Sequence, residues 1–345
     1  MINVAICGLG RMGSYHLGIY ERLMDEGFDV CVKAICDVEK DALDGLSTAT
    51  MNQASQRHIS TRTYAKYTSL DEMLQNEELD AVDVVTPTFL HSECAVKVLG
   101  SGRHCMCEKP MALDEAECRA MIDAAVKNGK VLMIGHCLRF WREYIWLHDR
   151  AVDGTYGELR SAYFTRGGFA DHVNNPSWHD WIITAEQGGG ALFDQHIHDS
   201  DFILWTFSMP ESVTVRGRKY FPKSKNDIVS AQYACGDKIL TAHDNIAYSA
   251  LPFSYGYTAD FERASAVFDG QKLTVYEKPQ NSFVPALSCY GDSDAYYNEI
   301  KYFLSCIKDG RQPTRCMPVE SMDTVKLVRA EEHSADNGGV PFLIK

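Results

Sequence analysis

Two carboxylates and an imidazole follow one another along a single predicted helix near the middle of the chain. Asp194 and His198 are four residues apart, and Asp201 lies three residues further on. This spacing places side chains on one face of an α-helix. An imidazole titrates near neutral pH, and a neighbouring carboxylate can hold its tautomer and stabilise its cation. The spacing therefore indicates acid–base chemistry, although a plain ion pair on the helix surface would give the same pattern.

A lysine stands at the end of a predicted buried strand. Lys109 follows the apolar segment 104–107 and precedes Pro110. A lysine ammonium is a compact positive charge, which suits it to stabilise a developing oxyanion. A solvated surface lysine is the alternative for this residue taken alone.

Glycines at three positions follow the first predicted strand. Gly8, Gly10 and Gly13 form G-x-G-x-x-G between the strand 2–7 and a predicted helix, and Asp37 ends the second strand. In this context the backbone can approach a pyrophosphate at the helix N-terminus, and the acidic residue can accept hydrogen bonds from a ribose. The carboxylate of Asp37 would repel a 2′-phosphate, so NAD is favoured over NADP. Arg11 could reach a 2′-phosphate, contact the pyrophosphate or remain solvated.

The elements that must position these residues alternate between strand and helix in the first part of the chain. Apolar strand patterns cover 2–7, 30–36, 81–85, 104–107 and 131–134, and helical patterns cover 12–25, 91–99 and 115–128. Ser69-x-x-Glu72 and Asp114-x-x-Glu117 are capping boxes. The alternation predicts a doubly wound parallel sheet, a Rossmann domain, over residues 1–134.

The pattern changes after residue 134. Helices are predicted over 141–152, 191–207, 295–308 and 319–335, and alternating strands over 158–166, 212–219, 228–235, 238–247, 258–268 and 272–276. This predicts a second domain over 135–345, of α+β class, with a large antiparallel or mixed sheet.

Four motifs, in order, resemble one known family. Besides the glycine motif, they are Thr86-Pro87-Thr88-Phe89-Leu90-His91, Glu108-Lys109-Pro110, and the run from Gly188 to His198 that opens the second-domain helix. Their order and spacing resemble the glucose-fructose oxidoreductase, inositol dehydrogenase and rhizopine catabolism (Gfo/Idh/MocA) family over essentially the whole chain. Thr88 departs from the asparagine that is frequent there, and His196 is not a usual marker of the family.

The resemblance implies roles for named residues. Lys109, with a cis bond to Pro110, resembles the lysine that polarises the reacting hydroxyl, and Asp194 and His198 resemble the residues that orient the substrate and exchange its proton. The residues that fall on cofactor-binding positions are Gly8, Gly10, Arg11, Met12, Gly13, Asp37, Thr86, Pro87, His91, Glu108 and Lys109.

Further candidates are aromatic or cationic. Aromatic faces beside polar tips suit a polyhydroxylated ring, although a place in the core or an interface is the commoner explanation. The substrate-binding candidates, besides Lys109, Asp194 and His198, are Arg139, Trp141, Arg166, Trp178 and Trp181. Arg166 could instead pair with an acidic residue. No metal is expected, because the histidine and aspartate spacings around 172–199 fit no standard ligand set.

Composition excludes several classes of protein. The chain has 345 residues, of which 45% are hydrophobic, and its net charge of −13 disfavours nucleic acid as a partner. No apolar run is long enough for a membrane span. Twelve cysteines without a C-x-x-C pair indicate a reducing, cytoplasmic setting.

The expected function is hydride transfer between NAD and a hydroxyl-bearing carbon of a sugar, cyclic polyol or glycoside. In this mechanism His198 removes the hydroxyl proton and Lys109 stabilises the alkoxide. Two alternatives remain open: an enzyme that keeps NAD bound and uses transient oxidation for elimination or epimerisation, and an NAD-sensing or scaffold protein without turnover. A homo-oligomer, dimer or tetramer, through the C-terminal sheet is expected.

Overall fold

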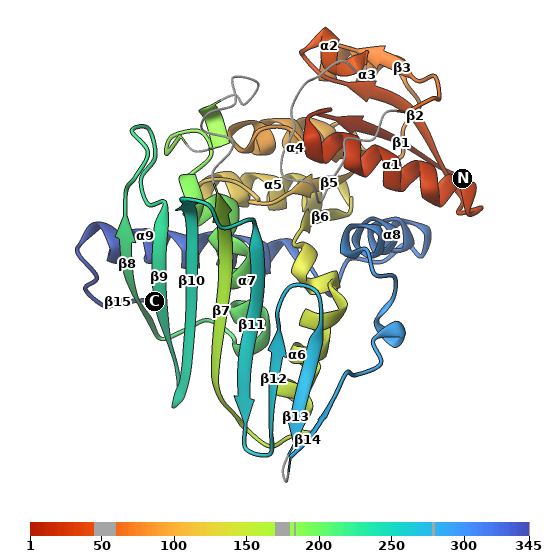
Figure 1. Cartoon of the computed structure of the whole chain (residues 1–345). Coiled ribbons are helices and arrows are strands. Elements are labelled where there is room, and N and C mark those ends of the chain that lie inside the picture. Colours follow the sequence, from red (N-terminus) through yellow and green to blue (C-terminus); the bar gives the residue numbers. More distant parts are fainter. Residues whose placement is uncertain (45–59, 170–179, 183, 278–279, 345) are drawn as a thin grey trace. The chain divides into compact units, whose positions relative to one another are not determined.

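The chain forms two compact units in the computed structural model, which describes residues 1–44, 60–169, 180–182, 184–277 and 280–344 (Figure 1). Unit 1 contains Met1–His136 and Tyr296–Met322. Unit 2 contains most of residues 137–295 together with Asp323–Lys345.

Unit 1 is built on a six-stranded parallel sheet with the strand order β3-β2-β1-β4-β5-β6. The strands are β1 (Ile2–Cys7), β2 (Val30–Cys36), β3 (Ala65–Tyr67), β4 (Ala81–Val84), β5 (His104–Glu108) and β6 (Leu132–Gly135). All residues of β4 and β6 are buried, as expected of parallel strands covered on both faces. The predicted Rossmann sheet is confirmed, and the short edge strand β3 is an addition to it.

Two helices of unit 1 begin at side-chain caps that the sequence predicts. Ser69 accepts a hydrogen bond from the Glu72 amide at the start of α3, and Asp114 accepts one from Glu117 at the start of α5. Gly129 ends α5 in the left-handed region, at φ 61°. The helices are α1 (Arg11–Asp25), α2 (Lys40–Leu43), α3 (Leu70–Asn76), η1 (Thr88–Leu90), α4 (His91–Gly100) and α5 (Glu115–Asn128).

One late helix, α8 (Ala295–Lys308), packs in unit 1 rather than with the second domain. Tyr296 meets the ring of Tyr15 edge to face at 5.5 Å, and the guanidinium of Arg22 lies 4.1 Å from the centre of the Tyr297 ring. Both contacts bind α8 to α1. The predicted division at residue 134 therefore differs from the observed units, because helical periodicity does not reveal which sheet a helix will cover.

Unit 2 contains a nine-stranded mixed sheet in the order β14-β13-β12-β11-β7-β10-β9-β8-β15. The strands are β7 (Leu159–Phe169), β8 (Ser212–Arg218), β9 (Ile228–Cys235), β10 (Lys238–Tyr248), β11 (Ser254–Phe261), β12 (Ala264–Phe268), β13 (Leu273–Glu277), β14 (Asn281–Phe283) and β15 (Phe342–Leu343). The sequence predicted one strand over 258–268. The structure corrects this to the antiparallel pair β11 and β12, which turns at Glu262 and Arg263.

Helices cover one face of this sheet (Figure 1). The longest are α6 (Arg142–Asp153), α7 (Ile197–Phe207) and the C-terminal part of α9 (Pro318–Asp336). The shorter helical segments of unit 2 are η2 (Cys137–Phe140), η4 (Asp180–Ile182), η5 (Leu192–His196) and η6 (Ser288–Tyr290). Between helices and sheet lies an aromatic core in which Tyr144 meets Phe202 and Tyr257 edge to face at 5.2 and 5.4 Å. Such pairs add to the free energy of burial.

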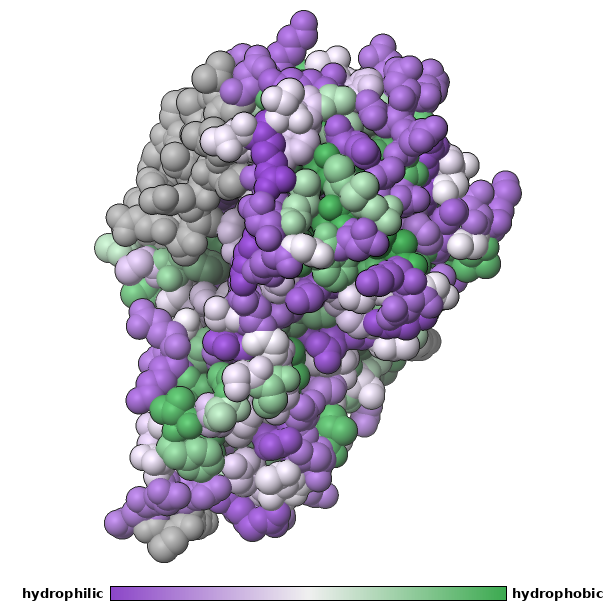
Figure 2. Space-filling model, turned by 90° about the vertical axis from the view of Figure 1, so that its right-hand side faces the viewer, coloured by the Kyte–Doolittle hydropathy of each residue, from purple (hydrophilic) through white to green (hydrophobic). Residues whose placement is uncertain are grey.

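The surface is mostly polar on the face drawn in Figure 2, where hydrophobic residues are scattered among hydrophilic ones. Within the described ranges, every helix is too short or too polar to cross a bilayer.

Candidate functional site

The glycine motif forms a tight loop between β1 and α1. Gly8 has φ +98°, and a Cβ added to it would lie 2.5 Å from the Val85 carbonyl oxygen. A Cβ on Gly13 would fall on the carbonyl oxygen of Gly8, deep inside van der Waals contact. Both positions therefore require glycine for the loop itself to form.

Gly10 differs from its two partners because a Cβ there would meet nothing within 4 Å. Gly10 is the N-cap of α1, has no side chain to cap it, and no acidic residue lies in the first turn. The first turn of α1 thus has no side-chain cap, whereas amides at the starts of α3 and α5 donate to Ser69 and Asp114. A helix N-terminus of this kind fits the pyrophosphate of a dinucleotide.

Asp37 is fixed by backbone donors just beyond β2. Its Oδ2 accepts a hydrogen bond from the Leu9 amide at 2.6 Å, and its Oδ1 accepts one from Glu39 at 2.9 Å. The half-buried carboxylate therefore stands beside the glycine loop, and its neighbour Val38 is exposed. The residues of this loop fit an adenosine ribose bound at Asp37.

His91 is buried rather than open to a ligand. Its Nδ1 lies 2.7 Å from the Pro110 carbonyl oxygen and its Nε2 lies 2.8 Å from that of Thr86. Burial lowers the pKa of His91. The side chain therefore joins the turn after β4 to the turn after β5, and it supports Thr86 and Pro87 without reaching solvent.

Glu108 is the last residue of β5 and belongs to a buried cluster of charges. His16 of α1 places Nδ1 2.9 Å from Asp83 and Nε2 3.2 Å from Glu108. Burial disfavours the imidazolium, but Asp83 and Glu108 raise the pKa of His16 well above its usual value. Burial alone would raise the pKa of Glu108, whereas His16 lowers it. The cluster is therefore a cation held between two carboxylates.

Lys109 follows this cluster directly. Its backbone amide donates to Glu108 Oε2 at 3.0 Å, and the Lys109–Pro110 bond is cis, as predicted. The side chain is half-buried. The buried charges of β5 thus fix the backbone that carries the lysine.

The predicted second-domain helix begins as a π-helical turn. Residues Leu192–His196 are π-helical and α7 starts at Ile197. Asp194 lies in the π turn, where Gln195 Nε2 donates to it at 3.0 Å, and His198 lies in α7 with Nδ1 3.8 Å from the Cys137 sulfur. The α-helical spacing assumed for these residues is therefore wrong, since π turns change the angle between successive side chains, and such turns are frequent at functional sites.

Asp201 does not extend a reactive face. It is buried and accepts two bonds from Arg139, Nε–Oδ2 at 2.9 Å and Nη2–Oδ1 at 2.8 Å, and one from Thr324 at 2.9 Å. Arg139 is fully buried. The substrate role predicted for Arg139 finds no support in this position, because its guanidinium binds an internal carboxylate.

The other substrate candidates are distributed over unit 2. Arg166 is buried and pairs with Asp199 at 3.1 Å, the alternative that its sequence position left open. Trp141 is half-buried and meets Tyr255 edge to face at 5.3 Å. Trp181 is half-buried in η4, and Trp178 lies outside the described residues. Among the residues with described positions, no His, Cys, Asp and Glu group of three or more could hold a metal ion.

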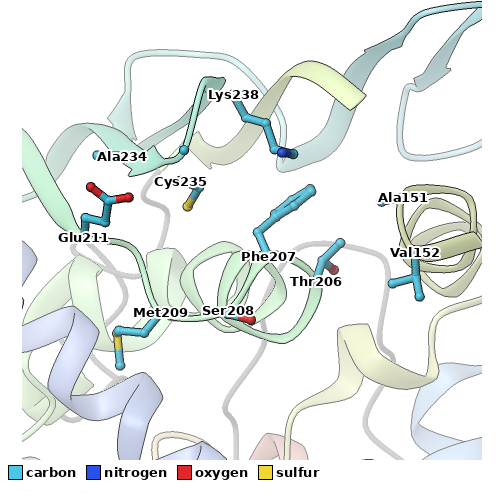
Figure 3. Close-up of a pocket in the computed structure, with 11 residues that line it drawn as sticks. Ala151, Val152, Thr206, Phe207, Ser208, Met209, Glu211, Ala234, Cys235 and Lys238 are labelled. Carbon is cyan, nitrogen blue, oxygen red and sulfur yellow. The ribbon is translucent and has the colours of Figure 1, made fainter. Parts of the chain in front are cut away.

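A pocket of about 370 Å³ opens at the far end of α7 (Figure 3). Its lining includes Val152, Phe207, Glu211 and Lys238. His198 stands at the start of α7, about 14 Å away along the helix axis at 1.5 Å per residue. The pocket is therefore separate from Asp194 and His198.

The sequence patterns do not predict that two buried histidines, His16 and His196, belong to charged clusters. One signal was available for the first: Asp83 interrupts the apolar strand 81–84, and a buried carboxylate requires a partner. No comparable signal marks the partners of His196, which come from distant strands and a distant helix.

Two family models match the chain. One, described as "Oxidoreductase family, NAD-binding Rossmann fold", matches residues 2–136, and the other, the "GFO/IDH/MocA C-terminal domain", matches residues 144–272. Together they span more than half of the chain.

Curated relatives agree with these models. A 2,7-anhydro-N-acetylneuraminate hydratase of Escherichia coli (strain K12) is 29% identical over 77% of this chain and 62% of its own length. A scyllo-inositol 2-dehydrogenase (NAD(+)) of Bacillus subtilis (strain 168) is 25% identical over 90% of this chain and 88% of its own length. The chain spans 62% of the hydratase, and only 40% of an uncharacterized oxidoreductase of Streptococcus pneumoniae that is 34% identical.

A solved structure of levoglucosan dehydrogenase, in complex with NADH and levoglucosan, shares the fold. Its TM-score is 0.82, with 18% identity and 99% of both chains covered. The order of motifs, the two sheets and the family models lead to one conclusion: the chain belongs to the GFO/IDH/MocA family of oxidoreductases and carries its NAD-binding Rossmann domain.

Proposed function

We propose that the protein is an NAD-dependent dehydrogenase that oxidises a CH–OH group of a sugar, cyclic polyol or glycoside. The observation that carries this is the N-terminus of α1 at Gly10, which has no side-chain cap and lies beside the carboxylate of Asp37. The names of the inositol and levoglucosan dehydrogenases supply the substrate class. When bound, NAD accepts a hydride from the carbon that bears the reacting hydroxyl.

Lys109 supplies a cation to the proposed reaction. Lys109 extends from a turn that the buried Glu108 and His16 hold in place. Its ammonium stabilises the alkoxide that develops as the hydroxyl proton leaves. Because this charge is needed only in the transition state, Lys109 acts on turnover more than on binding.

His198 is the proton acceptor in this proposal. His198 removes the hydroxyl proton, and Asp194 binds and orients the substrate. Trp141, Trp181 and, outside the described residues, Trp178 are candidates for contact with a sugar ring, since aromatic faces pack on its apolar C–H surface. Arg139 and Arg166 are bound to Asp201 and Asp199, and they hold α7 in place.

Asp37 sets the preference for NAD over NADP. A carboxylate in this place accepts hydrogen bonds from the ribose hydroxyls and repels a 2′-phosphate. The exposed Val38 and Glu39 that follow it carry no positive charge.

A second candidate function comes from the hydratase relative, which is 29% identical over 77% of this chain. In that case the enzyme would keep NAD bound, oxidise a hydroxyl transiently, and use the increased acidity of the neighbouring C–H for elimination or epimerisation. The two functions differ in net NADH formation.

One panel of substrates tests both. Inositols, glucosides, levoglucosan and 2,7-anhydro-N-acetylneuraminate are incubated with enzyme and NAD, and both NADH absorbance and substrate loss are followed. NADH formed in proportion to substrate lost supports the dehydrogenase, whereas substrate loss without NADH supports the second function. If neither changes, the protein does not act on these classes.

Two variants assign the residues. His198→Ala is expected to lower turnover by about 10²-fold or more, the usual scale for a general base. Lys109→Met should depress turnover while the folded protein still binds NAD. Lys97→Met removes an exposed lysine of the same unit and should leave turnover unchanged.

We also propose a homo-oligomer in the cytoplasm. Ile239, Tyr163 and Tyr276 lie on the solvent side of the nine-stranded sheet and are 56%, 46% and 49% exposed. A dimer or tetramer would bury them. Light scattering of wild type and Ile239→Lys tests the assembly, and fractionation of cells tests the location.

A further inference from the structure

His196 is a fully buried histidine between two residues of the proposed site. It is the last residue of the π turn η5, two positions after Asp194 and two before His198. Its side chain contacts residues of β9, β10 and the part of α9 that belongs to unit 2.

The contacts of His196 determine its protonation. Nδ1 lies 3.1 Å from the carboxylate oxygen Oδ2 of Asp244 in β10. Nε2 lies 3.0 Å from the hydroxyl of Tyr233 in β9, and this hydroxyl donates its one hydrogen to Glu331 Oε1 at 2.9 Å. Since the hydroxyl of Tyr233 must then accept from Nε2, both ring nitrogens donate. A histidine that donates from both nitrogens is an imidazolium.

The charges around the ring favour the same state. Glu331 of α9 places Oε2 3.7 Å from Nε2, and Asp199 of α7 adds a further negative charge. Burial lowers the pKa of His196, but Glu331 and Asp244 outweigh burial and raise it to about 9. Burial, and then the charge of His196, lower the pKa of the half-buried His243 next to Asp244 in β10, so His243 adds no second cation at neutral pH and above.

The two carboxylates depend on the cation in return. Burial raises the pKa of Asp244 to about 6, and burial also raises the pKa of Glu331. Arg166 of β7 favours the ionised form of Asp244. Ser200 of α7 donates to Glu331 Oε1 at 2.8 Å and so ties the first turn of α7 to the same carboxylate.

We propose that His196 is a positioning residue whose buried imidazolium fastens the π turn carrying Asp194, and the start of α7 carrying His198, to β9, β10 and α9. The inference rests on the proposed function of Asp194 and His198. His196 itself contacts internal side chains and acts through the helix.

This arrangement has a consequence for pH. A neutral imidazole has one N–H, so it can donate to Asp244 or to Tyr233 but not to both. When pH rises through the pKa of His196, Nε2 becomes an acceptor if Nδ1–H stays on Asp244. The Tyr233 hydroxyl must then either lose its bond to the ring or turn its one hydrogen from Glu331 to Nε2. In both cases one hydrogen bond of this network is lost together with the charge attraction to Asp244 and Glu331, and the π turn is held less firmly. Turnover should therefore fall at alkaline pH because of a group that does not contact the substrate.

The first experiment needs no substrate. Histidine ring signals of the full chain are followed by NMR from about pH 6 to about pH 10, and the His196 signal is identified by its loss in His196→Gln or, if that variant does not fold, by its shift in Tyr233→Phe. The expected result is an imidazolium that persists at neutral pH and titrates on the alkaline side. A ring that is neutral at pH 7 overturns the inference.

The second experiment moves the pKa of His196 without touching Asp194 or His198. Asp244→Asn keeps an acceptor for Nδ1 and removes the negative charge, which should lower the pKa of His196 by about one unit or more. The alkaline limb of kcat should shift down by the same amount, with KM for NAD unchanged. His243→Gln, on the same strand, is the matched control and should leave kcat and its alkaline limb in place.

The results of these experiments distinguish failure of the His196 inference from failure of the proposed function. Where wild type turns over a substrate, His196→Gln should lower kcat by about tenfold to a hundredfold, the scale of a small misplacement of reacting groups. An alkaline limb that stays fixed in Asp244→Asn overturns the inference and leaves the dehydrogenase proposal standing. If no member of the panel is turned over, the proposed function fails, and the NMR titration alone decides the state of His196.

Discussion

Replacing Gly10 by alanine tests whether the N-terminus of α1 is a cofactor site without disturbing the fold. A Cβ at Gly10 meets nothing within 4 Å, and the residue has φ −61°, which alanine adopts freely. The free energy of unfolding should therefore change by no more than about 0.5 kcal/mol. The new methyl group would stand where the pyrophosphate must approach the backbone.

The expected loss of NAD affinity follows from overpacking. Inserting a methyl group into a closely packed contact costs about 1–3 kcal/mol, which corresponds to a dissociation constant about fivefold to 150-fold higher. Calorimetric titration with NAD measures the affinity, and urea unfolding measures stability on the same samples.

Two other glycines serve as controls. Gly13→Ala would place a Cβ on the Gly8 carbonyl oxygen, so it should lower stability by about 3 kcal/mol or more and lose NAD binding with it. Gly100→Ala in α4 also meets open space and should change neither quantity. If Gly10→Ala binds NAD as tightly as wild type, the pyrophosphate does not lie at this helix and the reasoning is refuted.

Three further predictions concern charges. Asp37→Ala should narrow the preference for NAD over NADP, measured by calorimetry, and tighter NADP binding by wild type would contradict the role of Asp37. Arg139→Met and Asp201→Leu should each lower the free energy of unfolding by about 3–5 kcal/mol, because each leaves its partner as an unpaired buried charge. The double variant removes both charges and should lose far less than the sum of the two. Additive losses in urea unfolding would count against this reasoning. His16 has a folded-state pKa raised above its unfolded value, so its stabilisation is full below about pH 6.5 and is lost as pH rises through the folded-state pKa. The difference in unfolding free energy between wild type and His16→Asn should accordingly be largest near pH 6. A difference that increases as pH rises would show that His16 is neutral in the folded protein.

The sequence predicted best where a local pattern alone decides the structure. The strands 2–7 and 30–36 are found at the predicted residues, and the caps at Ser69, Asp114 and Gly129 form as expected. The predictions failed where tertiary contacts decide. The turn at Glu262 and Arg263 carries neither glycine nor proline, so the sequence pattern predicts one strand where the structure has two.

The candidate site shows the same division. Motif order alone predicts Lys109, Asp194 and His198 as site residues, whereas the burial of Arg139 and His91 depends on which distant groups the fold places beside them. Hydrophobic periodicity also does not distinguish a π turn from the first turn of an α-helix. The sequence pattern therefore predicts one continuous α-helix where the structure has the π turn η5 before α7.

The cluster of Asp83, His16 and Glu108 constrains how this chain can change through evolution. The three residues come from β4, α1 and β5 and are all buried. Loss of the histidine alone would leave two carboxylates facing one another without a cation, and loss of one acid would leave the charges unbalanced. A single substitution at any of these three positions should therefore be strongly destabilising. Related chains that lack the histidine should also have replaced both acidic residues. Comparison of many relatives at three distant alignment columns would show this as correlated replacement.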